Sequence, residues 1–429
     1  MILTLKNIGK IRKAQLDIDG ITVIAGANGT GKSTAGRALF AMLNGFCNLP
    51  QKIEEERVGS IEGLLDHMYY DRDTRLTSFP DTNAMAKEIV SHRQAYQAVE
   101  DAEFEQSILA LLHRFAPQED DFPEGADLHE TFSRIKSILR VSDEQLLSSI
   151  LDRSFYAEFY GQVSNIYDDS QSEATLQIRG KDFTVSWEHG EIAESHKSED
   201  FSLQSEPIYL EDPFVLDSVR SRPLFDLDRR FVNHRALLGR KLFSKAKREN
   251  LVDEIITKNK LETIYQRISS VCGGDVISLG HSGLGYRQKN SDKVLDVKNL
   301  STGLKTFAIL KTLLLNGVIK QNGTIILDEP EIHLHPEWQL LFAELIVLLQ
   351  KEFSLHILLN THSPYFLNAI EVYTRKYHVE DQCKFYFSHL EDDCAVFDDV
   401  SGQIETVYQA LARPLQTLEN ESWRLHEAD

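Results

Sequence analysis

Cysteine and long apolar runs are both scarce in this sequence. Of 429 residues only four are cysteine, and Cys47, Cys272, Cys383 and Cys394 lack the paired spacing of a metal site. This scarcity argues against a disulfide framework and indicates a reducing compartment, with the four side chains as ordinary packing residues. No apolar run is long enough to span a bilayer, and the N-terminal MILTLKNIGK lacks the layout of a signal peptide. We therefore expect a cytoplasmic protein with no membrane segment.

Positive charge is in deficit as well, because 46 Lys and Arg face 66 Asp and Glu and leave a net charge of −20. Affinity for a nucleic-acid backbone comes from Lys and Arg that neutralise phosphates, so this balance disfavours a surface coated for nucleic acid. The segment 228–248 is the exception, since it gathers basic residues in a helical stretch: Arg229, Arg230, Arg235, Arg240, Lys241, Lys245, Lys247 and Arg248. A solvated helix face is the favoured interpretation, and a contact with nucleic acid or an acidic partner is the alternative.

The stretch GANGTGKST, residues 26–34, fills the pattern G-x-x-x-x-G-K-[ST]. An apolar run at 21–25 predicts a buried strand before it, and KSTAGRALFAML predicts a helix after it. In that setting backbone N–H groups surround a β-phosphate, Lys32 reaches the β- and γ-phosphates, and Ser33 ligates Mg²⁺. We therefore predict a nucleotide site, and its binding residues are Gly26, Asn28, Gly29, Gly31, Lys32, Ser33 and Thr34.

The rest of the chain indicates an α/β core interrupted by helices. The first twenty residues alternate as a hairpin, and helices are expected at 128–140 and 143–160, the second capped by Ser142 with Gln145 three residues later. Strands return at 174–180 and 183–192, followed by a polar loop at 193–206. The predicted domains are residues 1–46 as the first part of the core, 47–165 as a helical insertion and 166–429 as the remainder.

A second motif, which is acidic, lies in GTIILDEPEIHLHP. There a predicted buried strand at 324–327 is followed by Asp328 and Glu329. A carboxylate at such a strand end can hold the Mg²⁺ shell, and the next one can polarise the attacking water. We predict that Asp328 is the metal residue and Glu329 the general base. Glu331 ranks lower, because it lies two residues farther beyond the strand end.

Two further segments add candidate residues for the same site. LHILLNTHSP predicts a strand at 355–359 that leads to Asn360, Thr361 and His362, and strands of an open α/β sheet bind ligands at their carboxyl ends. His362 could then bond a γ-phosphate. NLSTGLK places Ser301 and Gly303 at the start of an amphipathic helix, where hydroxyl and N–H groups make an anion site.

In the order GANGTGKST, LSTG, LDEP and NTHSP, these motifs resemble those of an ABC-class ATPase of the group shared by chromosome-maintenance and repair proteins. DEPEIHLHP and THSPYFL are similar to the motifs of OLD-like ATPases and of the standalone ATPases in Septu and retron-associated anti-phage systems. The resemblance covers residues 1–44 and 276–418. It implies an ABC-type P-loop core with a mixed sheet, ATP and Mg²⁺ as cofactors, and catalytic roles for Lys32, Glu329 and the switch histidine His362.

The same resemblance implies a homodimer or higher homo-oligomer, in which Ser301 and Gly303 close on the γ-phosphate of a second subunit. Two features depart from the family pattern. Thr302 stands where ABC transporters usually have glycine, and no glutamine lid can be identified. A C-terminal Toprim nuclease, which OLD proteins proper carry, does not fit into the 67 residues (429 − 362) that follow His362. The acidic residues at 391–399 are read as a hairpin turn and not as a metal site.

Three hypotheses follow. The first is an ATP-binding and ATP-hydrolysing switch that dimerises around ATP and regulates a separately encoded effector, such as a nuclease, in anti-phage defence. The second is a chromosome-maintenance or repair ATPase that clamps DNA, which the basic segment 228–248 favours and the net charge of −20 opposes. The third, a transporter subunit, is disfavoured by the helical insertion and by Thr302.

Overall fold

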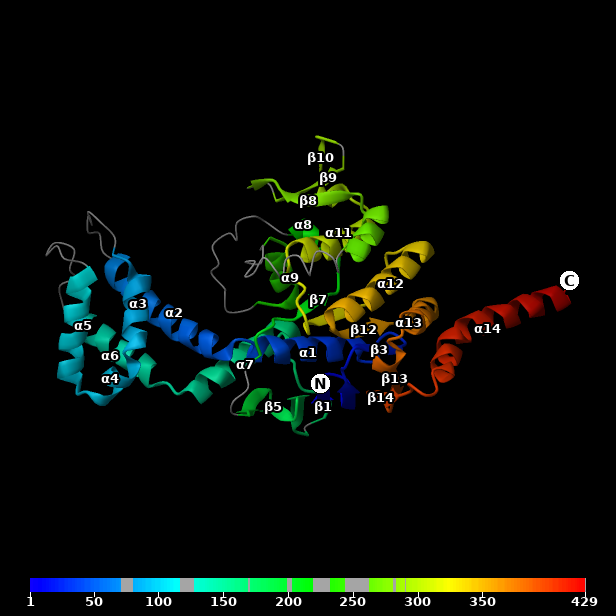
Figure 1. The fold of residues 1–429 in the computed structure, drawn as a ribbon. Coiled ribbons are helices and arrows are strands. Elements are labelled where there is room, and N and C mark those ends of the chain that lie inside the picture. The colour runs from blue at the N-terminus through cyan, green and yellow to red at the C-terminus, as the bar shows by residue number, and fades with distance from the viewer. Residues whose placement is uncertain are drawn as a thin grey trace. The chain divides into compact units, whose positions relative to one another are not determined.

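The computed structural model describes residues 1–70, 80–115, 127–168, 170–198, 203–218, 232–243, 262–280, 283–289 and 291–428. The chain divides into two compact units, of which the larger combines residues 1–47 with 151–429 and the smaller is residues 48–150. Each unit has its own cluster of buried apolar side chains. Figure 1 shows the elements of both units in chain order.

The smaller unit is helical in the part that the structure describes. Its helices are α2 Leu49–Tyr70, α3 Thr82–Ser91, α4 Arg93–Ala98, α5 Asp101–Phe115, α6 Asp127–Arg140 and the first half of α7 Asp143–Phe159. Apolar residues spaced three and four apart on α5 and α6, such as Phe104, Ile108 and Ile135, form its core. The predicted capping box is confirmed, because Ser142 N–H donates to Gln145 Oε1 (3.0 Å) and Gln145 N–H donates to Ser142 Oγ (3.1 Å).

The larger unit is built on a mixed sheet, which has 11 strands within the described residues, in the order β6-β5-β4-β1-β2-β14-β13-β3-β12-β11-β7. The strands are β1 Ile2–Ile8, β2 Ile11–Asp17, β3 Ile21–Gly26, β4 Ser172–Ile178, β5 Lys181–Glu188, β6 Glu191–Lys197, β7 Ile208–Leu210, β11 Thr324–Asp328, β12 His356–Thr361, β13 Cys383–Glu391 and β14 Cys394–Asp399. A separate small sheet has the order β10-β9-β8, with β8 Gly274–Ser278, β9 Leu284–Gln288 and β10 Val294–Asp296.

The half of the sheet formed by β7, β11, β12, β3 and β13 is parallel, so these strands end at one edge. The register pairs Asp328 with Asn360, Thr361 with Ala25 and Ser388 with Gly26. The polar residues that follow three distant strands therefore meet beside the phosphate loop, which is where open α/β sheets bind ligands.

The larger unit also contains helices. They are α1 Lys32–Phe46, the second half of α7, α8 Val215–Ser218, α9 His234–Phe243, α11 Thr302–Leu315, α12 Pro336–Phe353, α13 Pro364–Tyr377 and α14 Glu405–Ala428, together with helical residues 262–271 and the short 3-10 turns Val297–Asn299 and Glu380–Gln382. None of the helices in the described residues is long and apolar enough to cross a membrane.

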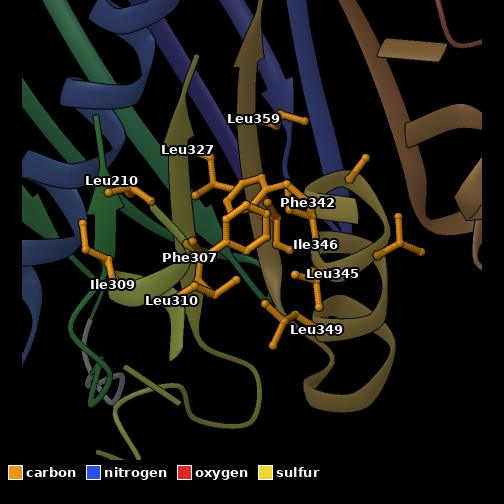
Figure 2. Close-up of a cluster of buried hydrophobic side chains, with 14 of the residues drawn as sticks. Leu210, Phe307, Ile309, Leu310, Leu327, Phe342, Leu345, Ile346, Leu349 and Leu359 are labelled. Carbon is orange, nitrogen blue, oxygen red and sulfur yellow. The ribbon is translucent and has the colours of Figure 1, made fainter. Parts of the chain in front are cut away.

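The two faces of the parallel half carry different residues, because successive side chains of a strand point to opposite faces. One face packs against α11 and α12, and Figure 2 shows Leu327 and Leu359 gathered there with Phe307 and Phe342. The other face receives α1 at Gly36, where a Cβ would lie 3.0 Å from the Tyr209 hydroxyl and 3.4 Å from Asn360 Nδ2. Glycine at this position therefore lets α1 pack against the residues that support the sheet edge.

Several local predictions are confirmed and one is wrong. The N-terminal hairpin, the strands before Asp328 and His362, and the acidic hairpin turn between β13 and β14 are all present. All four cysteines are described and are free thiols. The polar loop predicted at 193–206 is wrong in its first part, because β6 continues to Lys197 by pairing with β5.

Candidate functional site

The phosphate loop lies between β3 and α1 as predicted. Gly29 and Gly31 have φ values of 77° and 82°, which glycine adopts without the steric cost that a side chain would bring. At Gly26 a Cβ would lie 2.2 Å from the carbonyl oxygen of Ser388, so only glycine allows β13 to pair so closely there. The loop is also fixed by Thr30, whose hydroxyl donates to the carbonyl of Ala27 over 2.8 Å.

Lys32 is the cation at the centre of this loop. Its side chain is 4% exposed, and its ammonium donates to the carbonyl oxygens of Gly26 (3.0 Å) and Ala27 (2.8 Å). The ammonium also lies 3.5 Å from Glu329 Oε1. The structure thus brings together the loop cation and the predicted general base, which are far apart in the sequence.

Asp328 is buried at the end of β11, and both of its carboxylate oxygens accept hydrogen bonds. Tyr209 donates from its hydroxyl to Oδ2 (2.9 Å), and Asn360 donates from its amide to Oδ1 (3.0 Å). The same Asn360 amide donates to the carbonyl of Lys32 over 3.1 Å. These contacts hold the carboxylate in one orientation beside the phosphate loop.

Glu329 occupies a left-handed backbone conformation, with φ at 49°. A non-glycine residue adopts this conformation at a cost, and such positions are frequent at functional sites. The backbone N–H of Glu329 donates to the carbonyl of Asn360 (2.9 Å), and its Oε1 lies 3.1 Å from His362 Nδ1. Glu329, Lys32 and His362 therefore form one cluster at the sheet edge.

Glu331, the rival carboxylate, points elsewhere. It is 2% exposed, accepts a hydrogen bond from the Thr361 hydroxyl through Oε1, and leaves Oε2 with no hydrogen-bond partner. Burial raises the pKa of this carboxyl above its ordinary value. Glu329 lines the cavity beside the phosphate loop, and Glu331 is absent from that lining. This geometry favours Glu329 as the base.

The cavity beside the phosphate loop has a volume of ≈ 440 Å³. Asn28, Gly29, Gly31, Lys32, Ser33, Thr34, Asp328 and Glu329 line it, together with Lys10, Glu211 and Ile332. Sequence reasoning missed Lys10 and Glu211. Glu211 could have been found from the sequence, because it directly follows the apolar strand residues IYL. The same pattern identified Asp328.

Ser301 and Gly303 line a different depression, of ≈ 390 Å³, with Thr302, His333, His335 and Trp338. Ser301 is the N-cap of α11, yet its side chain makes no capping hydrogen bond. The two depressions share no lining residue. Ser301 and Gly303 are thus absent from the lining of the loop-side cavity in their own chain, although the consecutive residues Ile332 and His333 line one depression each.

A Mg²⁺ ion fits the donors at the loop-side cavity. Ser33 and Asp328 offer a hydroxyl and a fixed carboxylate, and Mg²⁺ is usually held by one or two such oxygens together with phosphates and water. In the described residues no group of three or more His, Cys, Asp or Glu side chains could hold a metal ion by itself. Ser33 and Asp328 would therefore hold the ion jointly with a bound nucleotide, where it would neutralise phosphate charge.

The basic segment is described only at residues 232–243. Arg235 contacts Glu211 (2.8 Å), and Lys241 contacts Glu206 (2.7 Å). Arg229, Arg230, Lys245, Lys247 and Arg248 lie outside the described residues. Two of the three described Lys and Arg side chains of this segment are thus paired with acids of the same chain, which favours the structural interpretation over a nucleic-acid surface.

Comparison with known proteins places the chain in a family. Residues 1–367 match the family model described as AAA ATPase domain. Among solved structures, the SMC head domain from Thermotoga maritima is 11% identical and covers 93% of this chain and 98% of its own, with a TM-score of 0.37. An SmcHead bound to the C-winged helix domain of ScpA is 13% identical and covers 94% and 98%, with a TM-score of 0.43.

A third structure, the Smc head domain with an extended coiled coil bound to the C-terminal domain of ScpA, derived from Pyrococcus furiosus, is 12% identical and covers 95% and 98%, with a TM-score of 0.34. Similarities at these TM-scores add nothing to the family match. The predicted fold class is confirmed by the mixed sheet with its phosphate loop between β3 and α1. The chain belongs to the AAA ATPase domain family, and its activity is ATP hydrolysis.

Proposed function

We propose that this ATPase is a two-subunit switch that closes around ATP and reopens after hydrolysis. The observation that carries the proposal is that Ser301, at the start of α11, does not line the phosphate-loop cavity of its own chain. A helix N-terminus with an uncommitted hydroxyl is suited to an anion. A second copy of the chain supplies that anion as the γ-phosphate bound to its own loop.

The residues predicted from the sequence each have a role in this proposal. Lys32 and the backbone of residues 26–34 bind the phosphates, and Ser33 with Asp328 hold Mg²⁺. Glu329 accepts the proton of the attacking water, since it opens into the cavity and lies beside Lys32. His362, 3.1 Å from the Glu329 carboxylate, orients it and contacts the γ-phosphate.

The subunit arrangement is tested by mixing Lys32→Ala subunits with Ser301→Arg subunits. If Ser301 acts on the partner, each mixed dimer has one composite site with both elements intact, and an equal mixture regains about a quarter of the wild-type ATPase activity. The matched control mixes Lys32→Ala with the double variant Lys32→Ala/Ser301→Arg, which offers no intact composite site. Absence of recovery in mixed dimers demonstrated by two affinity tags counts against the proposal.

The output of the switch, we further propose, is control of a separately encoded effector such as a nuclease in anti-phage defence. The support for this step is the resemblance of DEPEIHLHP and THSPYFL to the OLD-like defence ATPases. Tagged Glu329→Gln protein, expressed with its chromosomal neighbours and purified in ATP or in ADP, should retain an effector in one nucleotide state and release it in the other. Equal recovery of every neighbour in both nucleotides would refute regulated control.

DNA clamping is the competing output. The ion pairs of Arg235 and Lys241 with Glu211 and Glu206 oppose it, because those cations already have partners in their own chain. Salt-dependent binding of double-stranded DNA by the ATP-bound dimer, weakened by Arg240→Glu, would favour clamping over effector control.

A further inference from the structure

His234, at the start of α9, lies between two carboxylates. Its Nδ1 is 2.7 Å from Glu158 Oε2, and its Nε2 is 3.0 Å from Glu211 Oε2. A neutral imidazole can donate through one nitrogen only, so two carboxylate partners require both nitrogens to carry a proton. This geometry favours the imidazolium form of His234. Its backbone N–H donates to the other oxygen of Glu158 (2.7 Å), which fixes the start of α9 to that carboxylate.

The flat face of the same ring supports the residue that holds Asp328. His234 stacks on Tyr209, with ring centroids 4.3 Å apart and planes inclined by 26°. The edge of Phe40 packs against His234, with centroids 6.0 Å apart. Tyr209 is 1% exposed and donates its hydroxyl to Asp328. His234 thus contacts both Glu211, which lines the nucleotide cavity, and Tyr209, which orients Asp328.

The charges that face His234 come from four elements. Glu158 is on α7 and Glu211 follows β7, while Arg37 of α1 and Arg235 of α9 approach the same Glu211 carboxylate at 2.9 and 2.8 Å. Burial lowers the pKa of His234, but the hydrogen bonds to both carboxylates outweigh it and raise the pKa above its ordinary value. The His234 hydrogen bond likewise lowers the pKa of Glu211.

We propose that His234 is a positioning residue for ATP turnover, which fixes the Glu211 carboxylate and the Tyr209 hydroxyl at the nucleotide cavity. The inference rests on the proposed roles of Asp328 and the phosphate loop. The hydrogen bonds of Lys32 go to Gly26 and Ala27, whereas those of His234 go to Glu158 and Glu211. Loss of His234 should therefore lower kcat while the affinity for ATP is retained, because Lys32 is held by hydrogen bonds that do not involve His234.

The test compares His234→Gln, Glu158→Gln and the double variant with wild type. Glutamine at 234 cannot carry charge, so Glu158 would be left buried beside a neutral partner and the protein should melt at a lower temperature. The double variant removes that buried charge and should recover the melting temperature. Its kcat should stay low, by about tenfold to a hundredfold, because Tyr209 and Glu211 are still not held in place.

Arg235→Gln is the matched control. It removes a cation from the same Glu211 carboxylate by changing the next residue of the same helix, but its side chain is 54% exposed and contributes little. Its kcat and melting temperature should stay near those of wild type. An equal loss of kcat in Arg235→Gln would show that charge at Glu211 matters and the ring of His234 does not, which overturns the proposal.

Recovery of kcat in parallel with melting temperature in the double variant would assign His234 a purely structural role, and so would a His234→Gln protein with wild-type kcat. An independent readout is the ¹⁵N shift of the His234 ring in the wild-type protein, which should show an imidazolium at pH 7.5. A neutral ring there overturns the proposal even if no variant folds. Failure of the ATP-site assignment is distinguishable, since Lys32→Ala would then keep ATP affinity.

Discussion

The side-chain amide of Asn360 donates a 3.0 Å hydrogen bond to the carboxylate of Asp328. Its second amide hydrogen is directed to the carbonyl of Lys32 over 3.1 Å, so one buried side chain links the end of β11 to the first residue of α1. Asn360 is on β12, which lies between β11 and β3 in the sheet. Its side chain can therefore reach both Asp328 at the end of β11 and Lys32, which follows β3.

Asn360→Asp should lower stability and abolish turnover. The new carboxylate would face the carboxylate of Asp328 at about the same distance as the amide does now, and it could no longer donate to the Lys32 carbonyl. We expect a loss of about 1 to 3 kcal/mol in the free energy of unfolding, measured by denaturant titration. Asn360→Ser is the control that removes the amide without adding charge, and an aspartate variant as stable as the serine variant would contradict the like-charge argument.

Lys32→Ala should abolish ATP binding, because it removes the cation that the loop presents to the β- and γ-phosphates. The measurement is the affinity for a fluorescent ATP analogue, in wild type and variant at matched ionic strength. Lys10→Ala, which changes the other lysine of the same cavity, is the control and should weaken binding less. An unchanged affinity in Lys32→Ala would remove the basis of the phosphate-loop assignment.

Glu329→Gln should bind ATP and scarcely hydrolyse it, with single-turnover rates reduced by about a hundredfold or more. Glutamine keeps the shape of the side chain but cannot accept the proton of water. The ATP-bound dimer should then persist, which size-exclusion chromatography in ATP would show. Glu331→Gln is the matched comparison: it should stay close to wild type, because that carboxyl is buried and its pKa is already raised. Hydrolysis lost only in Glu331→Gln would reverse the assignment.

The His234 network also predicts how stability depends on pH. The pKa of His234 is raised in the folded protein above its ordinary 6.5, so its stabilising effect is complete below pH 6.5 and is lost as pH rises through the folded value. The melting temperature of wild type should therefore fall on the alkaline side. In the His234→Gln/Glu158→Gln variant this part of the decrease should be absent, and identical alkaline profiles would contradict the imidazolium assignment.

Residues whose function depends on a fixed spacing along the chain could be predicted from the sequence. The glycines and Lys32 of residues 26–34, and the acids that follow a buried strand at 324–327, are recognised by their spacing alone. The capping pair Ser142 and Gln145 is equally local, since both hydrogen bonds lie within one helical turn. Such features need no knowledge of what packs against them.

Only the tertiary structure decided which distant residues complete the site. Tyr209 meets Asp328 because β7 pairs with β11 in parallel register, and His234 of α9 joins them by stacking on Tyr209 and bonding Glu158 of α7. Nothing in the local sequence marks Tyr209 or His234, since a buried tyrosine or histidine usually serves packing alone. The absence of Ser301 from the lining of the loop-side cavity is likewise a property of the folded chain. Local spacing sets the chemistry of each motif, whereas strand register and helix packing determine which motifs share a cavity.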